Sequence, residues 1–354
     1  MEHEGIEAVL AARWPEAKLR ESVELKGDAG VRSYVRLHLD GGGAPPTVMA
    51  MRFASDGSAR GNEESPEAPR RAEIPFLNVG RFLASRGIAV PAIYAAEESH
   101  GVILLEDLGD LALAEAAALA PPAEREAVLG PAIDLLAELA SLHSADPAGC
   151  YAFESEYGRD AIARELQVVA THGLAHARGL GVLSAGDDAP LEEALAPLGD
   201  RLASQPLAWM HRDFHCWNLH LDAAGRVRLI DFQDATIGPA FYDLASFLTD
   251  RDTDRFVDPE LERALVMRWA EAVRAAGGIA LPPPERLLEE YFAAVAYRTL
   301  RVIGRFGVLA LELGKPGYFE RYAPRMAKQT MRALDAVGME DLAECLFERS
   351  PIFI

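Results

Sequence analysis

The fold of this 354-residue chain is decided by two stretches near its middle, WMHRDFHCWNLHL at residues 209–221 and RLIDFQD at residues 228–234. Asp213 in the first stretch is followed after four residues by Asn218, and the second stretch is an apolar strand that runs into Asp231. Turn-forming residues lie between the two stretches and predict a β-hairpin, which would bring Asn218 and Asp231 close together.

These three side chains carry oxygen atoms suited to phosphoryl transfer, a reaction that needs positioning and charge neutralisation more than covalent help from the protein. A carboxylate on a tight loop can accept the proton of an attacking hydroxyl, which is the role predicted for Asp213. Mg²⁺ binds few protein groups together with phosphates, and it prefers oxygen ligands such as the Asn218 amide and the Asp231 carboxylate. We therefore predict a catalytic base and a magnesium site.

Two other interpretations of the same residues stay open. Taken one at a time, the two carboxylates could cap loops and the asparagine could fill a turn. A zinc site is the second alternative, but it leaves Asn218 and Asp231 unexplained. The zinc ligands would be His211, Asp213, His215 and His220.

The overall charge and the cysteines narrow the functional class. The chain has 35 basic and 55 acidic residues, a formal net charge of -20, so we predict neither a nucleic acid nor an anionic membrane as partner. Cys150, Cys216 and Cys345 lie far apart without the spacing of disulfides or zinc sites, which favours a reducing, cytoplasmic location. Charges interrupt the apolar stretches, and the first residues lack a secretory pattern, so neither a membrane helix nor a signal peptide is predicted.

The chain changes character near Gly109. Before this residue, β-favouring stretches alternate with turns, and after it long segments with helical periodicity dominate. This order predicts an α+β plan with a first lobe at residues 1–106 and a second at residues 107–354. Strands are expected at residues 21–25, 33–39, 47–53, 90–94, 101–105, 218–221 and 227–231, and a loop at residues 54–71. Helices are expected at residues 5–17, 75–86, 131–143, 160–169, 190–202, 259–276, 284–305 and 322–336.

Several motifs together resemble the aminoglycoside phosphotransferase/choline kinase superfamily. They are HRDFHCWN at residues 211–218, IDFQD at residues 230–234 and GPAFYDL at residues 238–244. Within it, the chain resembles the bacterial kinases of cell-wall recycling that phosphorylate the anomeric hydroxyl of N-acetylmuramate and N-acetylglucosamine. The motifs of this closer similarity are GDA at 27–29, YVR at 34–36, VP at 90–91, LLEDLG at 104–109, RVIG at 301–304 and GKPGY at 314–318.

The resemblance implies a bilobal, protein-kinase-like fold that uses ATP and Mg²⁺ to phosphorylate a small sugar or alcohol. It implies that the first lobe binds the nucleotide, with the turn at residues 26–33 over the phosphates. His211 and Asp243 would position the catalytic loop, Asp243 by accepting hydrogen bonds from the loop backbone, and the second lobe would carry the acceptor site. The hinge residues that would offer backbone groups to adenine are Glu106, Asp107 and Leu108.

The third expected strand departs from the kinase pattern. Kinases usually present Lys in a V-A-I-K context on this strand, whereas residues 48–52 read VMAMR and place Arg52 there. Arginine can pair with phosphates through two hydrogen bonds, so Arg52 is a candidate nucleotide-binding residue, with Glu73 as its candidate partner. Alternatively, Arg52 is a solvated charge at the strand end, and a non-catalytic pseudokinase scaffold stays open for the same reason.

The acceptor site is expected beside the catalytic loop. The carboxylate of N-acetylmuramate would suit an arginine. A cationic aminoglycoside or an amino alcohol is the alternative acceptor, because the chain is strongly acidic, and an acidic cleft without an arginine would favour it. The candidates for acceptor binding are Arg164, Asp234, Arg298 and Arg301, followed by Tyr157, Arg159 and Glu165.

Overall fold

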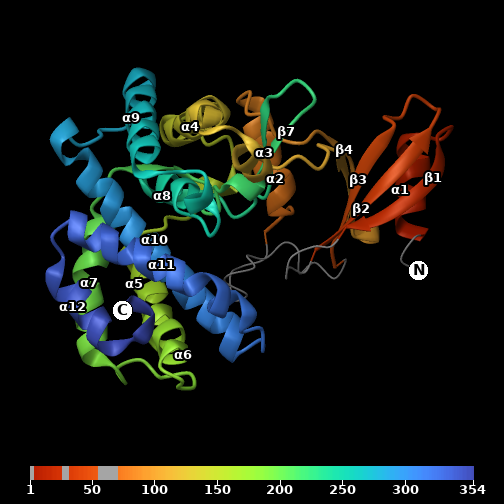
Figure 1. Cartoon of the computed structure of the whole chain (residues 1–354). Helices are drawn as coiled ribbons and strands as arrows, with labels where there is room; N and C mark the ends of the chain where they lie inside the picture. Colours follow the sequence, from red (N-terminus) through yellow and green to blue (C-terminus); the bar gives the residue numbers. More distant parts are fainter. Residues whose placement is uncertain (1–3, 26–31, 55–70) are drawn as a thin grey trace. The chain divides into compact units, whose positions relative to one another are not determined.

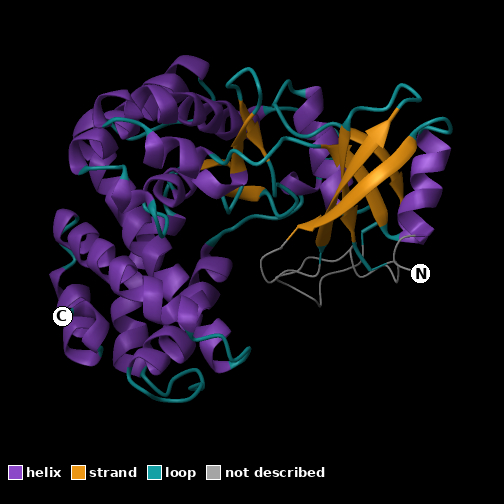
Figure 2. Cartoon of the chain, turned by 45° about the vertical axis from the view of Figure 1, so that its right-hand side comes forward, coloured by secondary structure: helices purple, strands orange, loops and turns teal. Residues whose placement is uncertain are grey.

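The computed structural model of the chain describes residues 4–25, 32–54 and 71–354. It divides into two compact units, the first made of residues 1–112 and 219–234 and the second of residues 113–218 and 235–354. The predicted α+β class is confirmed, because an antiparallel sheet dominates unit 1 and helices dominate unit 2 (Figures 1 and 2). Two expected segments lie mostly outside the described residues. These are the turn expected over the phosphates, of which residues 26–31 are not described, and the loop expected at residues 54–71, of which residues 55–70 are not described.

Unit 1 is built on a five-stranded antiparallel sheet in the order β1-β2-β3-β5-β4. Side chains alternate between the two faces of a strand, and the buried set that includes Val35 and Leu37 of β2 packs with Ile6 of α1. Helix α1 therefore covers one face of the sheet (Figure 1). The elements are α1 (Glu4–Arg13), β1 (Lys18–Leu25), β2 (Ser33–Asp40), β3 (Thr47–Arg52), β4 (Ile93–Glu97) and β5 (Val102–Glu106).

Helix α2 (Pro75–Ser85) and the hairpin of β7 (Leu219–Leu221) and β8 (Val227–Leu229) complete unit 1. Phe232, just after the hairpin, stacks on Phe76 of α2 with ring centroids 4.9 Å apart. A Cβ at Gly80 would lie 3.0 Å from the Phe232 ring, so the absence of a side chain at Gly80 permits this packing. Unit 1 thus holds residues 107–112 and a hairpin that the expected division after residue 106 assigned to the second lobe.

Unit 2 is helical apart from a small two-stranded sheet. Its longest helix, α10, carries a buried face along most of its length and is six residues longer than the expected helix at residues 284–305. Helix α4 likewise begins six residues before Pro131, the residue at which we expected it to start. The helices are α3 (Leu113–Leu119), α4 (Arg125–Ser141), α5 (Arg159–Val168), α6 (Ala175–Ala177), α7 (Ala189–Ala203), α8 (Tyr242–Leu248), α9 (Pro259–Ala276), α10 (Pro284–Leu311), α11 (Gly317–Ala336) and α12 (Glu340–Arg349), and the strands are β6 (Leu207–Met210) and β9 (Thr236–Pro239).

A π-helical segment, Val169–Leu174, follows α5 and packs backbone against backbone on α10. A Cβ at Gly307 would lie 2.5 Å from the backbone nitrogen of Gly173, and one at Gly304 would lie 3.1 Å from the nitrogen of Val169. The first distance is too short for any side chain and the second is tight, so the contact depends on glycine at position 307 and favours it at position 304.

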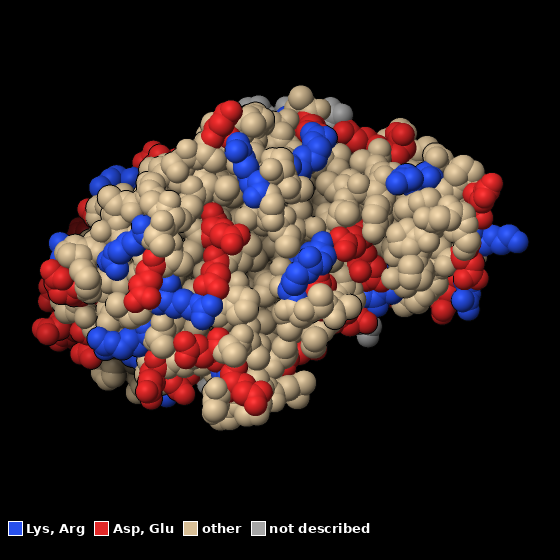
Figure 3. Space-filling model, turned by 90° about the horizontal axis from the view of Figure 1, so that it is seen from above, with Lys and Arg blue, Asp and Glu red and all other residues tan. Residues whose placement is uncertain are grey.

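The surface carries charges of both signs. Figure 3 shows acidic and basic side chains interspersed over the face seen from above. Among the described residues, none of the helices combines the length and the apolar character that crossing a bilayer demands.

Candidate active site

The catalytic loop predicted from residues 211–218 lies in unit 2; it follows β6 directly and ends in a 3-10 turn at Cys216–Asn218. Asp243, at the start of α8, accepts hydrogen bonds from the backbone nitrogens of His211 at 2.5 Å and Arg212 at 3.0 Å. Arg212 has a φ of 78°, which is uncommon for a residue with a side chain. The Asp243 carboxylate thus holds the loop in a conformation that this residue would not adopt readily by itself.

Two further hydrogen bonds fix the ends of the loop. The backbone nitrogen of Asp213 donates to His211 Nδ1 at 3.3 Å, and Asn218 Nδ2 donates to the carbonyl oxygen of Asp213 at 2.9 Å. Because Nδ2 faces that carbonyl, the amide oxygen of Asn218 lies on the other side of its side chain. Asp213 and Asn218 are therefore held in one orientation by the protein itself.

The Asp213 carboxyl is surrounded by positive charge. Burial by itself raises the pKa of this carboxyl. The guanidinium groups of Arg301 and Arg298, with smaller contributions from His215 and Arg212, outweigh burial and lower the pKa to about 2. Asp213 is consequently ionised at neutral pH, as a group that is to take up the proton of a hydroxyl must be.

The two arginines come from α10, three residues apart and so on the same face of the helix. Arg298 Nε donates to Ser246 Oγ at 3.2 Å. Arg301 Nε lies 3.3 Å from Glu165 Oε2, and the other oxygen of Glu165 accepts a 2.5 Å hydrogen bond from Arg305. Glu165, on α5, therefore links two arginines of α10.

The candidate Tyr157 belongs to the same buried cluster. Its hydroxyl shares a 2.8 Å hydrogen bond with the hydroxyl of Tyr297, and the Arg212 guanidinium lies 5.5 Å from the centre of its ring. Burial raises the pKa of Tyr157, so its hydroxyl stays protonated at neutral pH.

Asp231 lies in unit 1, two residues after β8, with a φ of 63°. Its side chain is 42% exposed, and its Oδ1 accepts a 3.0 Å hydrogen bond from Gln233 Nε2. The same Gln233 nitrogen donates to Asp234 at 3.0 Å, so the two carboxylates adjoin one amide group. Arg32 Nη1 lies 3.9 Å from Asp231 Oδ1.

The chain itself links the two predicted metal ligands. Asn218 immediately precedes Leu219, the first residue of β7. Leu219 is paired with Leu229 in the hairpin, two residues before Asp231. The predicted hairpin is therefore confirmed within unit 1.

The predicted hinge residues are anchored by ion pairs inside unit 1. Glu106 receives two hydrogen bonds from Arg228, at 2.6 and 3.1 Å, and one from the backbone nitrogen of Ala92. Asp107 receives two from Arg36, at 2.7 and 3.0 Å. Both acidic side chains are engaged in these pairs, so an adenine contact at residues 106–108 would have to come from the backbone, where the Glu106 nitrogen already donates to the Ala92 carbonyl at 2.8 Å.

Arg52 lies on the α1 face of the sheet. Its Nη2 pairs with Glu24 at 2.7 Å and its Nε donates to Ser33 Oγ at 2.9 Å. These contacts agree with the alternative that Arg52 is a charge at the strand end. The expected pairing of Arg52 with Glu73 was wrong, because Glu73 pairs with Arg81, the seventh residue of α2.

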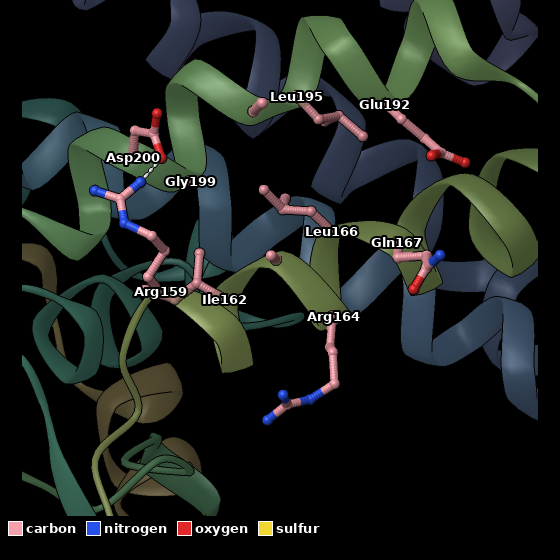
Figure 4. A pocket seen from close by; sticks show the side chains of 11 residues that line it. Arg159, Ile162, Arg164, Leu166, Gln167, Glu192, Leu195, Gly199 and Asp200 are labelled. Carbon is pink, nitrogen blue, oxygen red and sulfur yellow. Dashed lines mark hydrogen bonds and ion pairs between the residues drawn. The ribbon is translucent and has the colours of Figure 1, made fainter. Parts of the chain in front are cut away.

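Arg164 lies on the exposed side of α5, in a groove of about 330 Å³ between α5 and α7. Figure 4 shows its side chain extending away from Leu195 and Glu192 of α7. Arg159, at the other end of the groove, pairs with Asp200. Arg164 thus faces a different direction from its neighbour Glu165, which contacts Arg301.

Sequence reasoning missed several residues that support the site. Arg32, Ser246 and Gln233 carried no recognised signal, and the pairing of Arg228 with Glu106 joins residues 122 positions apart. Across the three described ranges, no three His, Cys, Asp or Glu side chains meet as a metal site would require, so the zinc alternative receives no support.

A sequence profile of the phosphotransferase enzyme family matches residues 28–289, which is most of the chain. The chain belongs to this family. An N-acetylmuramate/N-acetylglucosamine kinase of Pseudomonas aeruginosa is 31% identical over 314 residues, covering 88% of this chain and 83% of that protein. A protein of the same name from Neisseria meningitidis is 32% identical over 271 residues, covering 75% of each.

Solved structures of this phosphotransferase fold are similar over nearly the whole chain. A choline/ethanolamine kinase family protein from Mesorhizobium loti matches with a TM-score of 0.58 at 16% identity, covering 96% of this chain and 100% of that one. The ADP-bound aminoglycoside phosphotransferase APH(2'')-Ib matches with a TM-score of 0.55 at 15% identity, covering 97% and 99%. The predicted kinase-like fold, superfamily and enzyme class are thereby confirmed.

Proposed function

We propose that this phosphotransferase transfers the γ-phosphoryl group of ATP to the anomeric hydroxyl of N-acetylmuramate or N-acetylglucosamine. The observation that carries the proposal is the loop at residues 211–218, in which an ionised carboxylate and an oriented amide are held on one rigid turn. The names of the relatives that span most of the chain support the choice of acceptor.

Asp213 would accept a hydrogen bond from the sugar hydroxyl and direct its oxygen at phosphorus. A carboxylate with a pKa of about 2 is a poor proton acceptor from a neutral alcohol, so its early role is orientation. The proton would pass to Asp213 only as the bond to phosphorus forms, when the hydroxyl becomes far more acidic. Such positioning matches what phosphoryl transfer requires of a protein.

Asn218 and Asp231 would hold Mg²⁺, which neutralises charge on the phosphate oxygens when bound. The donors fit this ion, because each offers a hard oxygen and the Asp231 side chain is 42% exposed and accessible to a ligand. The backbone of residues 106–108 would contact adenine, in a first lobe that binds the nucleotide. His211 and Asp243 would keep the loop in place through the hydrogen bonds described above.

The arginines near Asp213 favour an anionic acceptor. Arg298 and Arg301 are both nearly buried, and a carboxylate is the group that pairs best with a guanidinium. N-acetylmuramate carries one, whereas a cationic aminoglycoside would be repelled. Arg164 and Asp234 remain secondary candidates for the acceptor, and a cytoplasmic location, where ATP is available, belongs to the same proposal.

Incubation with ATP, Mg²⁺ and a panel of acceptors tests the proposal, with the phosphorylated product identified by mass spectrometry. The panel contains N-acetylmuramate, N-acetylglucosamine, an aminoglycoside and choline. We expect a phosphate on the two sugars, lost on mild acid treatment as an anomeric phosphate is. Phosphorylation of the aminoglycoside or choline alone would overturn the choice of acceptor, and no product from any of them would overturn the proposed activity.

A further inference from the structure

We propose that Arg32 supplies the phosphate-binding positive charge that β3 of this protein does not provide. This inference rests on the proposed function, because it concerns the nucleotide of that reaction. The first observation concerns Arg52, which occupies the position on β3 where kinases usually have a lysine. Its guanidinium is engaged by Glu24 and Ser33 on the α1 face of the sheet.

The strand geometry explains why Arg52 and Arg32 differ. Ser33 and Arg52 are direct neighbours across β2 and β3, and their side chains meet on the α1 face. Because successive residues point to opposite faces, the residue before Ser33 is directed to the other face. That residue is Arg32, and its ion pair with Asp231 agrees with this direction.

The negative charge around Asp231 would be balanced by a positively charged side chain such as that of Arg32. Asp231 and Asp234 bring two negative charges to one amide group, and a bound triphosphate would add several more. One Mg²⁺ does not balance this charge. Lys18 is the only lysine among the described residues of unit 1, and it lies on β1 opposite Asp40, at the other end of the pairing with β2.

Arg32 is placed to change partner when nucleotide binds. Its side chain is only 14% exposed, and its Nη1 lies 3.9 Å from Asp231 Oδ1, on the partly exposed side of that carboxylate's surroundings where a nucleotide phosphate could approach it. A Mg²⁺ ion on Asp231 would weaken the attraction between Asp231 and Arg32, and the phosphate oxygens brought by the nucleotide would accept the guanidinium instead. Arg32 would thus neutralise Asp231 before binding and the phosphates afterwards.

Calorimetric titration of the full-length protein with ATP, ADP and adenosine, each with Mg²⁺, tests this role. We expect Arg32→Gln to weaken ATP binding about ten- to a hundredfold, as for one lost charge-assisted hydrogen bond, and to leave adenosine binding unchanged. Arg32→Lys should recover part of the loss. Arg52→Gln is the matched control, since it removes the same charge from the same sheet on the other face, and it should bind all three ligands normally.

The outcomes separate the inference from the function on which it rests. Equal weakening of ATP and adenosine by Arg32→Gln would mean that Arg32 is structural, and unchanged binding of all three would mean that it is not involved. Either result, or a larger loss in Arg52→Gln, would overturn the inference while leaving the kinase proposal intact. Absence of ATP binding by the unmodified protein would instead contradict the proposed function.

Discussion

The segments around Asp213 and Asp231 each contain a residue with positive φ, Arg212 and Asp231 itself, but they are held in different ways. The Asp213 loop is fixed from several sides, by Asp243, His211 and Asn218, before any ligand arrives. The Asp231 side chain is 42% exposed, and its contacts include an amide donor, Gln233, and an ion pair with Arg32 at 3.9 Å. We propose from this difference that the protein itself orients the predicted base, whereas a bound ligand would complete the predicted metal site.

The largest effect is expected from replacing Asp213, the predicted base of the loop that the protein holds in place. Asp213→Asn should lower kcat by about 10²- to 10⁴-fold, because the variant loses the acceptor that orients the hydroxyl. ATP binding should persist, since the loop is held by other residues. Steady-state kinetics and calorimetry measure the two effects. Asp222→Asn, in the turn between β7 and β8, is the control, and normal turnover of Asp213→Asn would refute our assignment of the base.

Neutralising Asp231 tests whether this second segment binds Mg²⁺. Asp231→Asn should weaken Mg²⁺-dependent ATP binding at least about tenfold, because the ion loses a charged ligand. Titration with and without Mg²⁺ isolates this effect, and Asp40→Asn on the sheet surface serves as a matched control. If the variant kept the Mg²⁺ dependence of the unmodified protein, Asp231 would not be a metal ligand.

The arginines beside Asp213 predict a smaller effect that depends on the acceptor. Arg301→Lys keeps the charge facing Glu165 but loses the paired donors of the guanidinium, so KM for N-acetylmuramate should rise about tenfold. KM for N-acetylglucosamine, which lacks the carboxylate, should change much less and is the internal control. Equal changes for the two sugars would argue against carboxylate recognition by Arg301.

The last prediction concerns the pH dependence of stability rather than ligand binding or turnover. Burial raises the pKa of Asp243 to about 7, against the two backbone donors that lower it. The folded state then binds a proton that the unfolded state releases between about pH 4 and 7, so this group reduces stability as pH rises, by up to about 1.4 kcal/mol per pH unit. Asp243→Asn should remove this slope in urea titrations. Asp213 should act oppositely, with stability lost only as pH falls from about 4 towards 2.

Local signals explain which elements could be predicted. Helix α9 has the bounds expected, because Asp258 caps its first turn, Pro259 opens it and Gly277 follows its end. Helix α8 escaped prediction because it has only seven residues and all of them are buried, including the polar Asp243 and Ser246, so no exposed polar face gives a period. Strands β6 and β9 pair across more than twenty intervening residues, a contact without local signal.

For the candidate site, too, features with a local sequence signal could be predicted and contacts between distant residues could not. The spacing from Asp213 to Asn218 and the hairpin leading to Asp231 are local and could be read from the sequence. Which arginine meets which acid could not, because Arg301 and Glu165 come from distant helices. Arg52 shows the limit of pattern matching, since the strand pattern places it correctly but does not say which face its side chain takes.

The glycine contact between the π-helical segment and α10 affects how substrate preference can change. Gly304 lies one turn beyond Arg301, and its contact with Val169 sets the depth at which α10 is seated. A methyl group there would lie 3.1 Å from the Val169 nitrogen, so one of the two segments would have to shift by a few tenths of an ångström, and a shift of α10 would move Arg298 and Arg301 with it. Selectivity for the sugar could therefore change through substitutions at positions that do not contact it. A comparison of the contact residues alone would not detect such a change.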